Sequence, residues 1–394
     1  MRKVYLFNPE NDLAMACGSQ RYDAPKSARR LAADMSLLPI WFAEPGSLVL
    51  TGTDVPSDYL SVVRQTLGLD VTWVSESAYP SVASADDSFS PWGWSLPLLY
   101  RLQQLIQTSS IVDVPDMERL RYWSSRERTV DLLSEMKTDG LLSADFPVPF
   151  LGRTMDELSE QASKWNEKCL LKAPWSGSGK GLRWLKYGWD ESIAGWCRNI
   201  LRKQKSVICE YHFDKVVDFA MEFSSKNGVV QFEGYSLFNT YESGTYRSNV
   251  LTSNASIEKR LASYVNSKEL MSVRNALIGI FEKDLSSFYT GFLGVDMMIC
   301  RTAENAYFVH PCVEINLRYN MGVVSRILFD RYFAEGVEGE YCILHAASAA
   351  ELLQEAERLR LAHPLQISEG RITAGFLLLT YIGEEAEYMA YCIV

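Results

Sequence analysis

Lys172-Ala-Pro-Trp-Ser-Gly-Ser-Gly-Lys-Gly181 is the stretch on which the expected fold of this chain depends. The strand-like segments at 169–172 and 182–185 predict that it connects two short strands. Its glycines leave the backbone free to direct several N–H groups at one anion, and Lys172 and Lys180 add two positive charges. These features favour a polyphosphate-binding loop. The alternative, from these residues alone, is a flexible hairpin loop with two solvated lysines.

Two common phosphate-binding loops do not fit this stretch. A Walker A loop ends in Gly-Lys-Ser/Thr, but here Gly181 follows Lys180, and Pro174 stands where the first glycine is required. A Rossmann fingerprint opens a helix, whereas a strand-like segment follows here. The loop is therefore expected to lie between strands and to cover a phosphate as a flap does.

Composition narrows the function classes. The 394-residue chain has 39 basic and 49 acidic residues, and its net charge of −10 argues against general binding to nucleic acid or to a membrane surface. The apolar run at the start is too short for a signal peptide, and none reaches the roughly 18 residues that span a bilayer. The eight cysteines are scattered without a CxxC pair, which predicts reduced, buried thiols in a cytoplasmic protein.

The first 120 residues alternate between strand and helix patterns, which predicts a small parallel sheet with helices on its faces. Residues 81–95, rich in Ser and Asp, are predicted to form a loop. The first strand runs into Asn8-Pro-Glu-Asn-Asp12, and polar residues in that position often line a ligand crevice; the alternative is a plain turn. The strands are expected at 3–7, 47–50 and 71–74, with a helix near 57–66.

The middle of the chain is predicted to be largely antiparallel. A helix over 124–136 carries Arg126 and Arg128, either of which could face a nucleotide, although a solvated helix face is the alternative. The last two strands are expected either to complete a sheet or to form a contact in a homodimer. The segments expected are strands at 206–211, 216–224, 228–235, 246–251, 291–300, 307–316, 371–382 and 386–394, and helices near 190–203, 256–264, 267–284 and 346–360.

A second chemical cluster lies on the two strands that flank the turn at 302–305. Glu314 and Asn316 share one strand face because they are two residues apart, and a reachable register brings Asp296 onto that face. Two carboxylates and an amide oxygen are hard ligands of the kind Mg²⁺ prefers. A solvated sheet edge is the alternative. Arg318, two residues further on, could lie near a transferring phosphoryl group.

The chain resembles the ATP-grasp superfamily over roughly residues 120–330. The resemblance rests on an ordered set of elements: Lys172, the loop at 176–181, Glu210 at the end of a strand, Gly294-Val-Asp296 and Glu314-Ile-Asn-Leu-Arg318. The Glu314-Ile-Asn-Leu-Arg318 ending is the most specific part. The resemblance implies a nucleotide held between two antiparallel β-subdomains, and the first segment fits the pre-ATP-grasp domain. The expected fold class is thus α/β and α+β, with a parallel α/β domain over 1–120, ATP-grasp subdomains over 121–205 and 206–335, and a C-terminal helix and strands over 336–394.

The resemblance also implies roles for individual residues. Lys172 would touch the α- or β-phosphate, while Glu210 and the backbone after Ile208 would meet the adenine edge. Asp218 stands where the family usually has a ribose-binding glutamate, and Arg128 or Arg126 replaces a lysine that many members carry. The phosphate-covering loop would comprise Ser176, Gly177, Ser178, Gly179, Lys180 and Gly181.

The implied catalytic residues are Arg318 and Lys180, and the implied Mg²⁺ ligands are Asp296, Glu314 and Asn316. Arg247 and Asn249 are expected either to face the acyl substrate or to lie on an ordinary exposed loop. His310 lies on the same hairpin as the proposed metal ligands and is expected to be a strand histidine whose ring nitrogens are hydrogen-bonded.

The function expected from the sequence is an ATP- and Mg²⁺-dependent ligase that joins a small-molecule carboxylate to an amine through an acyl phosphate. Two alternatives stay open: an ATP-grasp phosphotransferase that leaves phosphate on its substrate, and a non-catalytic nucleotide-binding regulatory protein.

Overall fold

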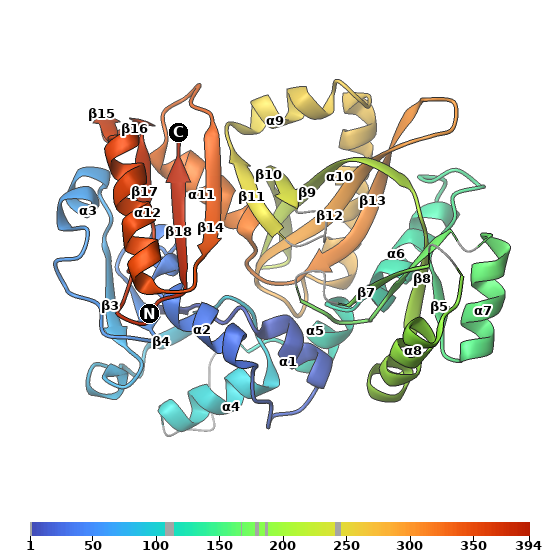
Figure 1. Ribbon diagram of the computed structural model, residues 1–394, viewed down its shortest axis with the longest axis horizontal. Helices are drawn as coiled ribbons and strands as arrows, with labels where there is room; N and C mark the ends of the chain where they lie inside the picture. Colours follow the sequence, from blue (N-terminus) through green and yellow to red (C-terminus); the bar gives the residue numbers. More distant parts are fainter. Residues whose placement is uncertain (1, 107–113, 167, 178–180, 186–187, 241–245) are drawn as a thin grey trace.

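The computed structural model describes residues 2–106, 114–166, 168–177, 181–185, 188–240 and 246–394. Three principal sheets follow one another across the molecule (Figure 1). The described part contains no helix both long enough and apolar enough to cross a membrane. All eight cysteines are free, and six of them are buried.

The N-terminal sheet is parallel, with strand order β3-β2-β1-β4, as the alternating pattern predicts. The prediction of a loop over 81–95 is wrong in part, because β4 lies there and pairs with β1. Its Ser- and Asp-rich sequence conceals a buried strand whose Asp87 is neutralised by Arg2 and accepts a hydrogen bond from Tyr79. The strands are β1 (Arg2–Leu6), β2 (Ser47–Thr51), β3 (Val71–Ser75) and β4 (Asp87–Pro91).

Helices and short 3₁₀ turns surround this sheet. The first of them, α1, begins directly after the carboxyl end of β1 and therefore brings the predicted crevice residues to the sheet edge. The elements are α1 (Asn11–Cys17), α2 (Lys26–Asp34), η1 (Leu38–Trp41), α3 (Ser61–Leu67), η2 (Tyr79–Ser81), α4 (Leu96–Leu105) and α5 (Met117–Trp123).

A small antiparallel sheet holds the glycine-rich stretch between its strands β6 and β7, as predicted. Helices α7 and α8 pack against it through an apolar cluster that includes Leu158 and Ile200. Helix α6 begins at Arg126, with Ser125 as its N-cap. The elements are α6 (Arg126–Thr138), β5 (Phe150–Gly152), α7 (Met155–Lys164), β6 (Cys169–Lys172), β7 (Leu182–Leu185), α8 (Glu191–Gln204) and β8 (Val207–Tyr211).

The largest sheet has the order β13-β12-β9-β10-β11-β14-β18-β17. The C-terminal strands extend this sheet beyond β11, so it crosses the boundary predicted at residue 335. The predicted strand over 371–382 is interrupted at Gly375, where φ is +106° and a Cβ atom would lie 2.3 Å from the Pro364 carbonyl oxygen. The strands are β9 (Asp214–Lys226), β10 (Val229–Thr240), β11 (Tyr246–Leu251), β12 (Gly291–Arg301), β13 (Tyr307–Asn316), β14 (Gly339–His345), β17 (Phe376–Leu378) and β18 (Tyr388–Ile393), beside a separate pair, β15 (Gln366–Ser368) and β16 (Arg371–Ala374).

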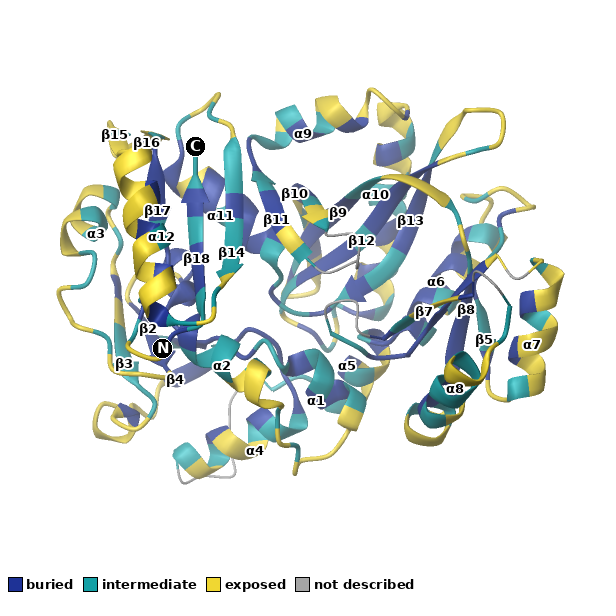
Figure 2. Ribbon diagram, viewed as in Figure 1, coloured by how far each residue is buried: buried dark blue, intermediate teal, exposed yellow. Residues whose placement is uncertain are grey.

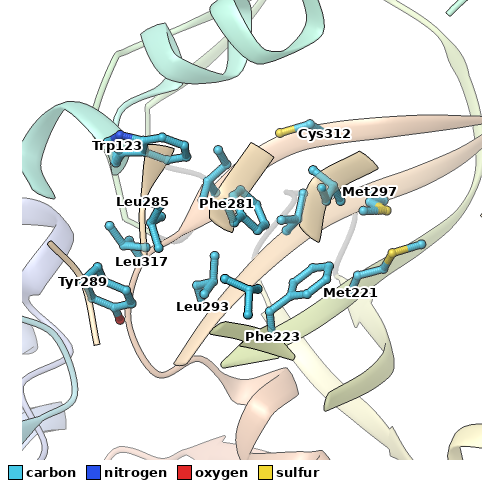
Figure 3. Packing of buried hydrophobic residues seen from close by; sticks show 14 of the residues in the cluster. Trp123, Met221, Phe223, Phe281, Leu285, Tyr289, Leu293, Met297, Cys312 and Leu317 are labelled. Atoms are coloured by element: carbon cyan, nitrogen blue, oxygen red, sulfur yellow. The ribbon is translucent and has the colours of Figure 1, made fainter. Parts of the chain in front are cut away.

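One face of this sheet is buried under helices. Phe223 and Leu293 on the strands belong to the same cluster as Phe281 of α10, whose ring contacts both Phe223 and Trp123 of α5 (Figure 3). Helix α11, which the sequence analysis did not predict, packs against β10 and β11 and is buried along most of its length, whereas α12 exposes its outer face (Figure 2). The helices are α9 (Asn254–Leu261), α10 (Ser267–Asp284), α11 (Met321–Tyr332) and α12 (Ala349–Ala362).

Tyr319 connects the large sheet to the N-terminal domain. It follows the end of β13, and its ring lies 4.7 Å from that of Phe42 and 6.1 Å from that of Trp92, measured between centroids. Its backbone N–H donates to the Trp92 carbonyl oxygen at 2.9 Å. This contact brings the chain just after the predicted metal ligands against the carboxyl end of the parallel sheet.

Candidate functional site

The small sheet, the large sheet and helix α1 enclose one cavity of about 1830 Å³. This volume exceeds the 300–1,000 Å³ typical of small-molecule sites, so the cavity has room for more than one ligand. The predicted site residues that line it are Lys172, Ser176, Gly177, Glu210, Asp218, Asp296, Glu314, Asn316 and Arg318.

Lys172 and Glu210 form a buried ion pair in the wall made by the small sheet. Adjacent strands β6 and β8 carry them, Lys172 Nζ lies 2.7 Å from Glu210 Oε2, and the two side chains are 4% and 5% exposed. A buried ammonium group needs such a partner because desolvation without one is costly. The pair therefore holds a positive charge in position at the cavity wall.

The described part of the glycine-rich loop turns tightly. A Cβ atom on Gly181 would lie 2.3 Å from Ser176 Cβ, so only glycine fits there. The Ser176 hydroxyl accepts a hydrogen bond of 2.9 Å from Arg126 Nη1, which also donates to the Ala173 carbonyl oxygen. The roles predicted for Ser178, Gly179 and Lys180 concern residues outside those that the structure describes.

Asp296, Glu314 and Asn316 lie together on one face of the large sheet. In the β12–β13 pairing Asp296 is directly opposite Glu314, and Gly294 is opposite Asn316, so the structure has the register that the sequence analysis considered reachable. Burial, together with the smaller effect of the nearby carboxylates Glu314 and Glu222, raises the pKa of Asp296 to about 8. Carboxylates that repel each other in this way favour binding of a cation.

The proposed metal site contains an amide oxygen in addition to its carboxylates, unlike a site made only of His, Cys, Asp and Glu side chains. Among the described residues, no group of three or more His, Cys, Asp and Glu side chains has the arrangement of a metal site. Here two carboxylates combine with an amide oxygen. Oxygen donors of this kind suit a hard divalent ion that keeps water in its remaining positions.

Arg318 is fixed by the N-terminal domain. Its guanidinium group makes a bidentate contact with Asp12 of α1, at 2.9 and 2.7 Å, and Nη2 donates to Asn316 Oδ1 at 2.8 Å. A planar fork of this kind fixes both the position and the direction of the guanidinium group. The positively charged guanidinium group of Arg318 therefore lies beside the predicted metal ligands.

Of the two arginines predicted to face a nucleotide, only Arg126 lines the cavity. Its Nη2 lies 2.6 Å from Glu314 Oε2. Arg128 points away, pairs with Glu135 at 2.9 Å and stacks on Trp123. The structure thus assigns Arg128, named as a nucleotide-binding residue from the sequence, to packing of α6.

Residues 8–12, which were predicted to line a ligand crevice, also differ in whether their side chains reach the cavity. Asp12 reaches the cavity, but Asn8 and Asn11 are 1% and 2% exposed and bind backbone groups of the β4–α4 connection. Replacing either asparagine would remove a hydrogen bond that holds the backbone of this connection. The expectation that residues 8–12 line the ligand crevice therefore holds for Pro9, Glu10 and Asp12 and not for these asparagines.

His310 is fully buried between Phe146 and Phe213, and burial lowers its pKa to about 4, so it is a neutral core residue. The expectation of a hydrogen-bonded histidine is wrong, because both ring nitrogens lack a hydrogen-bond partner among the described residues. Asn249 lines the cavity and Arg247, whose side chain is exposed, does not.

The sequence analysis missed Glu222, a buried carboxylate in the cavity wall. It is 1% exposed and accepts hydrogen bonds from Ser236 Oγ at 2.8 Å and Asn320 Nδ2 at 2.9 Å. Burial raises its pKa to about 7, against the lowering effect of both hydrogen bonds. A local signal existed, because Glu222 shares a strand face with Asp218, four residues earlier.

Comparisons with known proteins support the fold. No family model matches the chain, and no curated protein matches it. Solved structures do: a biotin carboxylase from Campylobacter jejuni with a β,γ-ATP compound is 10% identical with a TM-score of 0.52, and the match covers 100% of this chain and 87% of that one. The biotin carboxylase domain of the Hydrogenobacter thermophilus 2-oxoglutarate carboxylase, with MgADP and bicarbonate, is 11% identical with a TM-score of 0.51, covering 100% and 86%.

The ADP complex of the N5-carboxyaminoimidazole ribonucleotide synthetase PurK is 12% identical with a TM-score of 0.50, covering 100% of this chain and 92% of that one. At these identities the likeness establishes the fold. The chain has the ATP-grasp fold, with the N-terminal parallel domain and the antiparallel subdomains that the sequence resemblance implied.

The variant Glu222→Gln tests how much the buried carboxylate lowers the free energy of unfolding. Its pKa of about 7, against an ordinary 4.5, means that the folded state holds the proton more tightly than the unfolded state. The free energy of unfolding therefore falls as pH rises from about 4.5 to about 7. At roughly 1.4 kcal/mol per pKa unit, less one weakened hydrogen bond, we expect Glu222→Gln to be more stable than wild type by about 1–3 kcal/mol at pH 8, with little difference at pH 5.

Urea unfolding at both pH values measures this difference. Glu233→Gln is the matched control because Glu233 is an exposed acid on the neighbouring strand β10, and it should leave the pH dependence unchanged. A Glu222→Gln protein less stable than wild type at pH 8 would contradict the assigned burial cost.

Proposed function

We propose that this protein is an ATP- and Mg²⁺-dependent ligase that joins a carboxylate to an amine through an acyl-phosphate intermediate. One observation carries the proposal. Lys172, the carboxylates Asp296 and Glu314, and Arg318 come from separate parts of the chain and line the same cavity in a chain with the ATP-grasp fold. Phosphoryl transfer needs positive groups beside the phosphates and carboxylates that bind a metal ion, and these residues supply both.

The residues present fit a bound nucleotide. The nucleotide would lie between the small sheet and the large one, with its base against Leu170 and Met298 and near Glu210, its ribose near Asp218, and its phosphates toward Lys172 and Ser176. All of these line the cavity. Apolar walls with a few fixed polar groups are typical of nucleotide and cofactor sites.

The donor set fits Mg²⁺ as well. Asp296 and Glu314 repel each other across adjacent strands, and a divalent ion bound by them and by Asn316 would remove that repulsion. When bound, the ion would neutralise charge on the phosphates. Arg126 holds one oxygen of Glu314 and Arg318 holds the Asn316 amide oxygen, so both ligands are already oriented.

The proposed reaction has two steps. In the first, a carboxylate oxygen of the acid attacks the γ-phosphorus, the bond from that phosphorus to the β–γ bridging oxygen breaks, and ADP leaves. In the second, the amine nitrogen attacks the acyl carbon, the bond from that carbon to the phosphate oxygen breaks, phosphate leaves, and the nitrogen loses a proton. Arg318, fixed by Asp12, would orient the acid and stabilise charge on the transferring group.

The pair of Asp12 and Arg318 gives a first test. We expect Asp12→Asn to lower turnover about ten- to a hundredfold, because the guanidinium group loses its bidentate partner and its fixed direction. The affinity for ATP should change less than about threefold. Asp23→Asn, which alters an acid with an 88%-exposed side chain in the same domain, should leave both quantities unchanged. Equal loss of ATP binding in Asp12→Asn would contradict the separate role given to this pair.

A trapping assay tests the reaction itself. Hydroxylamine serves as a general amine, a panel of carboxylic acids supplies the acyl group, and ADP and hydroxamate are both measured. We expect at least one acid to give ADP and hydroxamate in equal amounts, only with Mg²⁺. ADP with a stable phosphorylated acid and no hydroxamate would indicate a phosphotransferase. ATP binding without ADP release across the panel would indicate a regulatory nucleotide-binding protein.

A further inference from the structure

The cavity continues well beyond the predicted metal ligands. Its floor is one face of the large sheet, and it runs from β13 and β12 across β9 to β10, β11, β14 and β18, under helix α2. We call the part beyond β9 the arm. The side chains that define it are Leu31, Phe238, Asn249, Ile343, His345 and Tyr388.

The arm differs from the nucleotide end in charge. Among the described residues of α2, β10, β11, β14 and β18 that line the cavity, none is Asp, Glu, Lys or Arg. The lining is apolar and aromatic, with a few neutral hydrogen-bonding groups. The arm therefore suits a ligand body without charge.

Glu222 stands where the arm meets the predicted phosphoryl-transfer site. It lies on β9, with Ser236 of β10 on the arm side and the β12 strand of Asp296 on the other. The two arginines whose positive charges lower its pKa, Arg318 and Arg326, form their ion pairs with Asp12 and Asp330. A buried carboxylate with only neutral hydrogen-bond donors is suited to a ligand that brings its own N–H groups or positive charge.

Two glycines make room for this carboxylate. A Cβ atom on Gly322 would lie 2.0 Å from Glu222 Oε1, and one on Gly294 would lie 2.4 Å from Oε2. The backbone of β12 and of the first turn of α11 can approach Glu222 only because both side chains are absent. The surrounding backbone is therefore shaped to fit the carboxylate, although burying Glu222 lowers the stability of the folded protein.

We propose that the arm is the binding site of the amine substrate and that Glu222 binds its amino group, so that the substrate class is a primary amine carried on an uncharged, apolar or aromatic body. This rests on the proposed ligase function. The opposite assignment, an acid in the arm, would set its carboxylate against Glu222 with no lysine or arginine among the described residues of the arm. Arg318, on the other side of the site, suits the acid instead.

Calorimetry with three matched probes tests the assignment: 2-phenylethylamine, 2-phenylethanol and 3-phenylpropanoate, titrated into the full chain at pH 8 with MgADP. We expect the amine to bind at least tenfold more tightly than the alcohol. Glu222→Gln should reduce the affinity for the amine to that for the alcohol. Phe238→Ala should weaken both probes and keep their ratio, because it changes the body site and not the amino-group site.

Glu233→Gln should bind all probes as wild type does. MgADP affinity, measured in the same samples, keeps this test separate from the proposed function and shows that the variants are folded. With MgADP bound, equal affinity for amine and alcohol, no binding of either, or an unchanged ratio in Glu222→Gln would overturn the proposal. Preferred binding of 3-phenylpropanoate would overturn it in favour of an acid site. Absence of MgADP binding would count against the ligase function itself.

Discussion

The burial of carboxylates on one sheet face is the constraint on which this structure depends. Asp296, Glu314 and Glu222 converge on one sheet face, and both Asp296 and Glu222 hold their protons more tightly than ordinary acids do. Each part of the fold supplies a group that makes the cluster tolerable. Helix α6 supplies Arg126 to Glu314, the chain after β13 supplies Arg318, and β10 supplies Ser236 to Glu222. Buried carboxylates reduce the stability of the free protein, and the mutual repulsion of Asp296 and Glu314 favours the binding of a cation.

The domains are joined through the same charges. Arg318 follows the large sheet, but its carboxylate partner Asp12 belongs to the N-terminal domain, and Tyr319 packs into that domain's aromatic core. Arg126 links the helix beside the small sheet to Glu314. These contacts therefore connect the elements of all three sheets at the cavity. The absence of Cβ atoms at Gly181, Gly294 and Gly322 matters equally, because each allows a close approach at the cavity wall.

Sequence reasoning succeeded where a short-range pattern determines the outcome. The turn at 302–305 and the alternation around Glu314 limited the register of β12 and β13 to a few choices, and the structure has one of them. The long helix α10 and the strand β11 have the predicted bounds. The strand β4 was missed because its polar residues are buried by partners such as Arg2, 85 residues away in the sequence.

The failures at the site have the same cause. Arg126 and Arg128 are two residues apart, so they point about 200° apart around a helix, and only the packing of α6 decides which one reaches the cavity. Glu222 depends on Asn320 and Gly322, about a hundred residues later, for its hydrogen bond and its space. No local pattern shows that these residues meet. Tertiary contacts likewise decide that Asp12 reaches the cavity while the two asparagines bind the backbone, and no local pattern in residues 8–12 shows this.

Calorimetric titration with ATP, with and without Mg²⁺, tests the central claim most directly, using wild type, Lys172→Ala and Glu314→Ala. A nucleotide site built from the Lys172 wall and the Asp296–Glu314 pair predicts binding that is strengthened by Mg²⁺ in wild type. Lys172→Ala should weaken binding under both conditions, and Glu314→Ala should remove mainly the Mg²⁺-dependent part. Absence of ATP binding by well-folded wild type, or unchanged binding in both variants, would contradict the account.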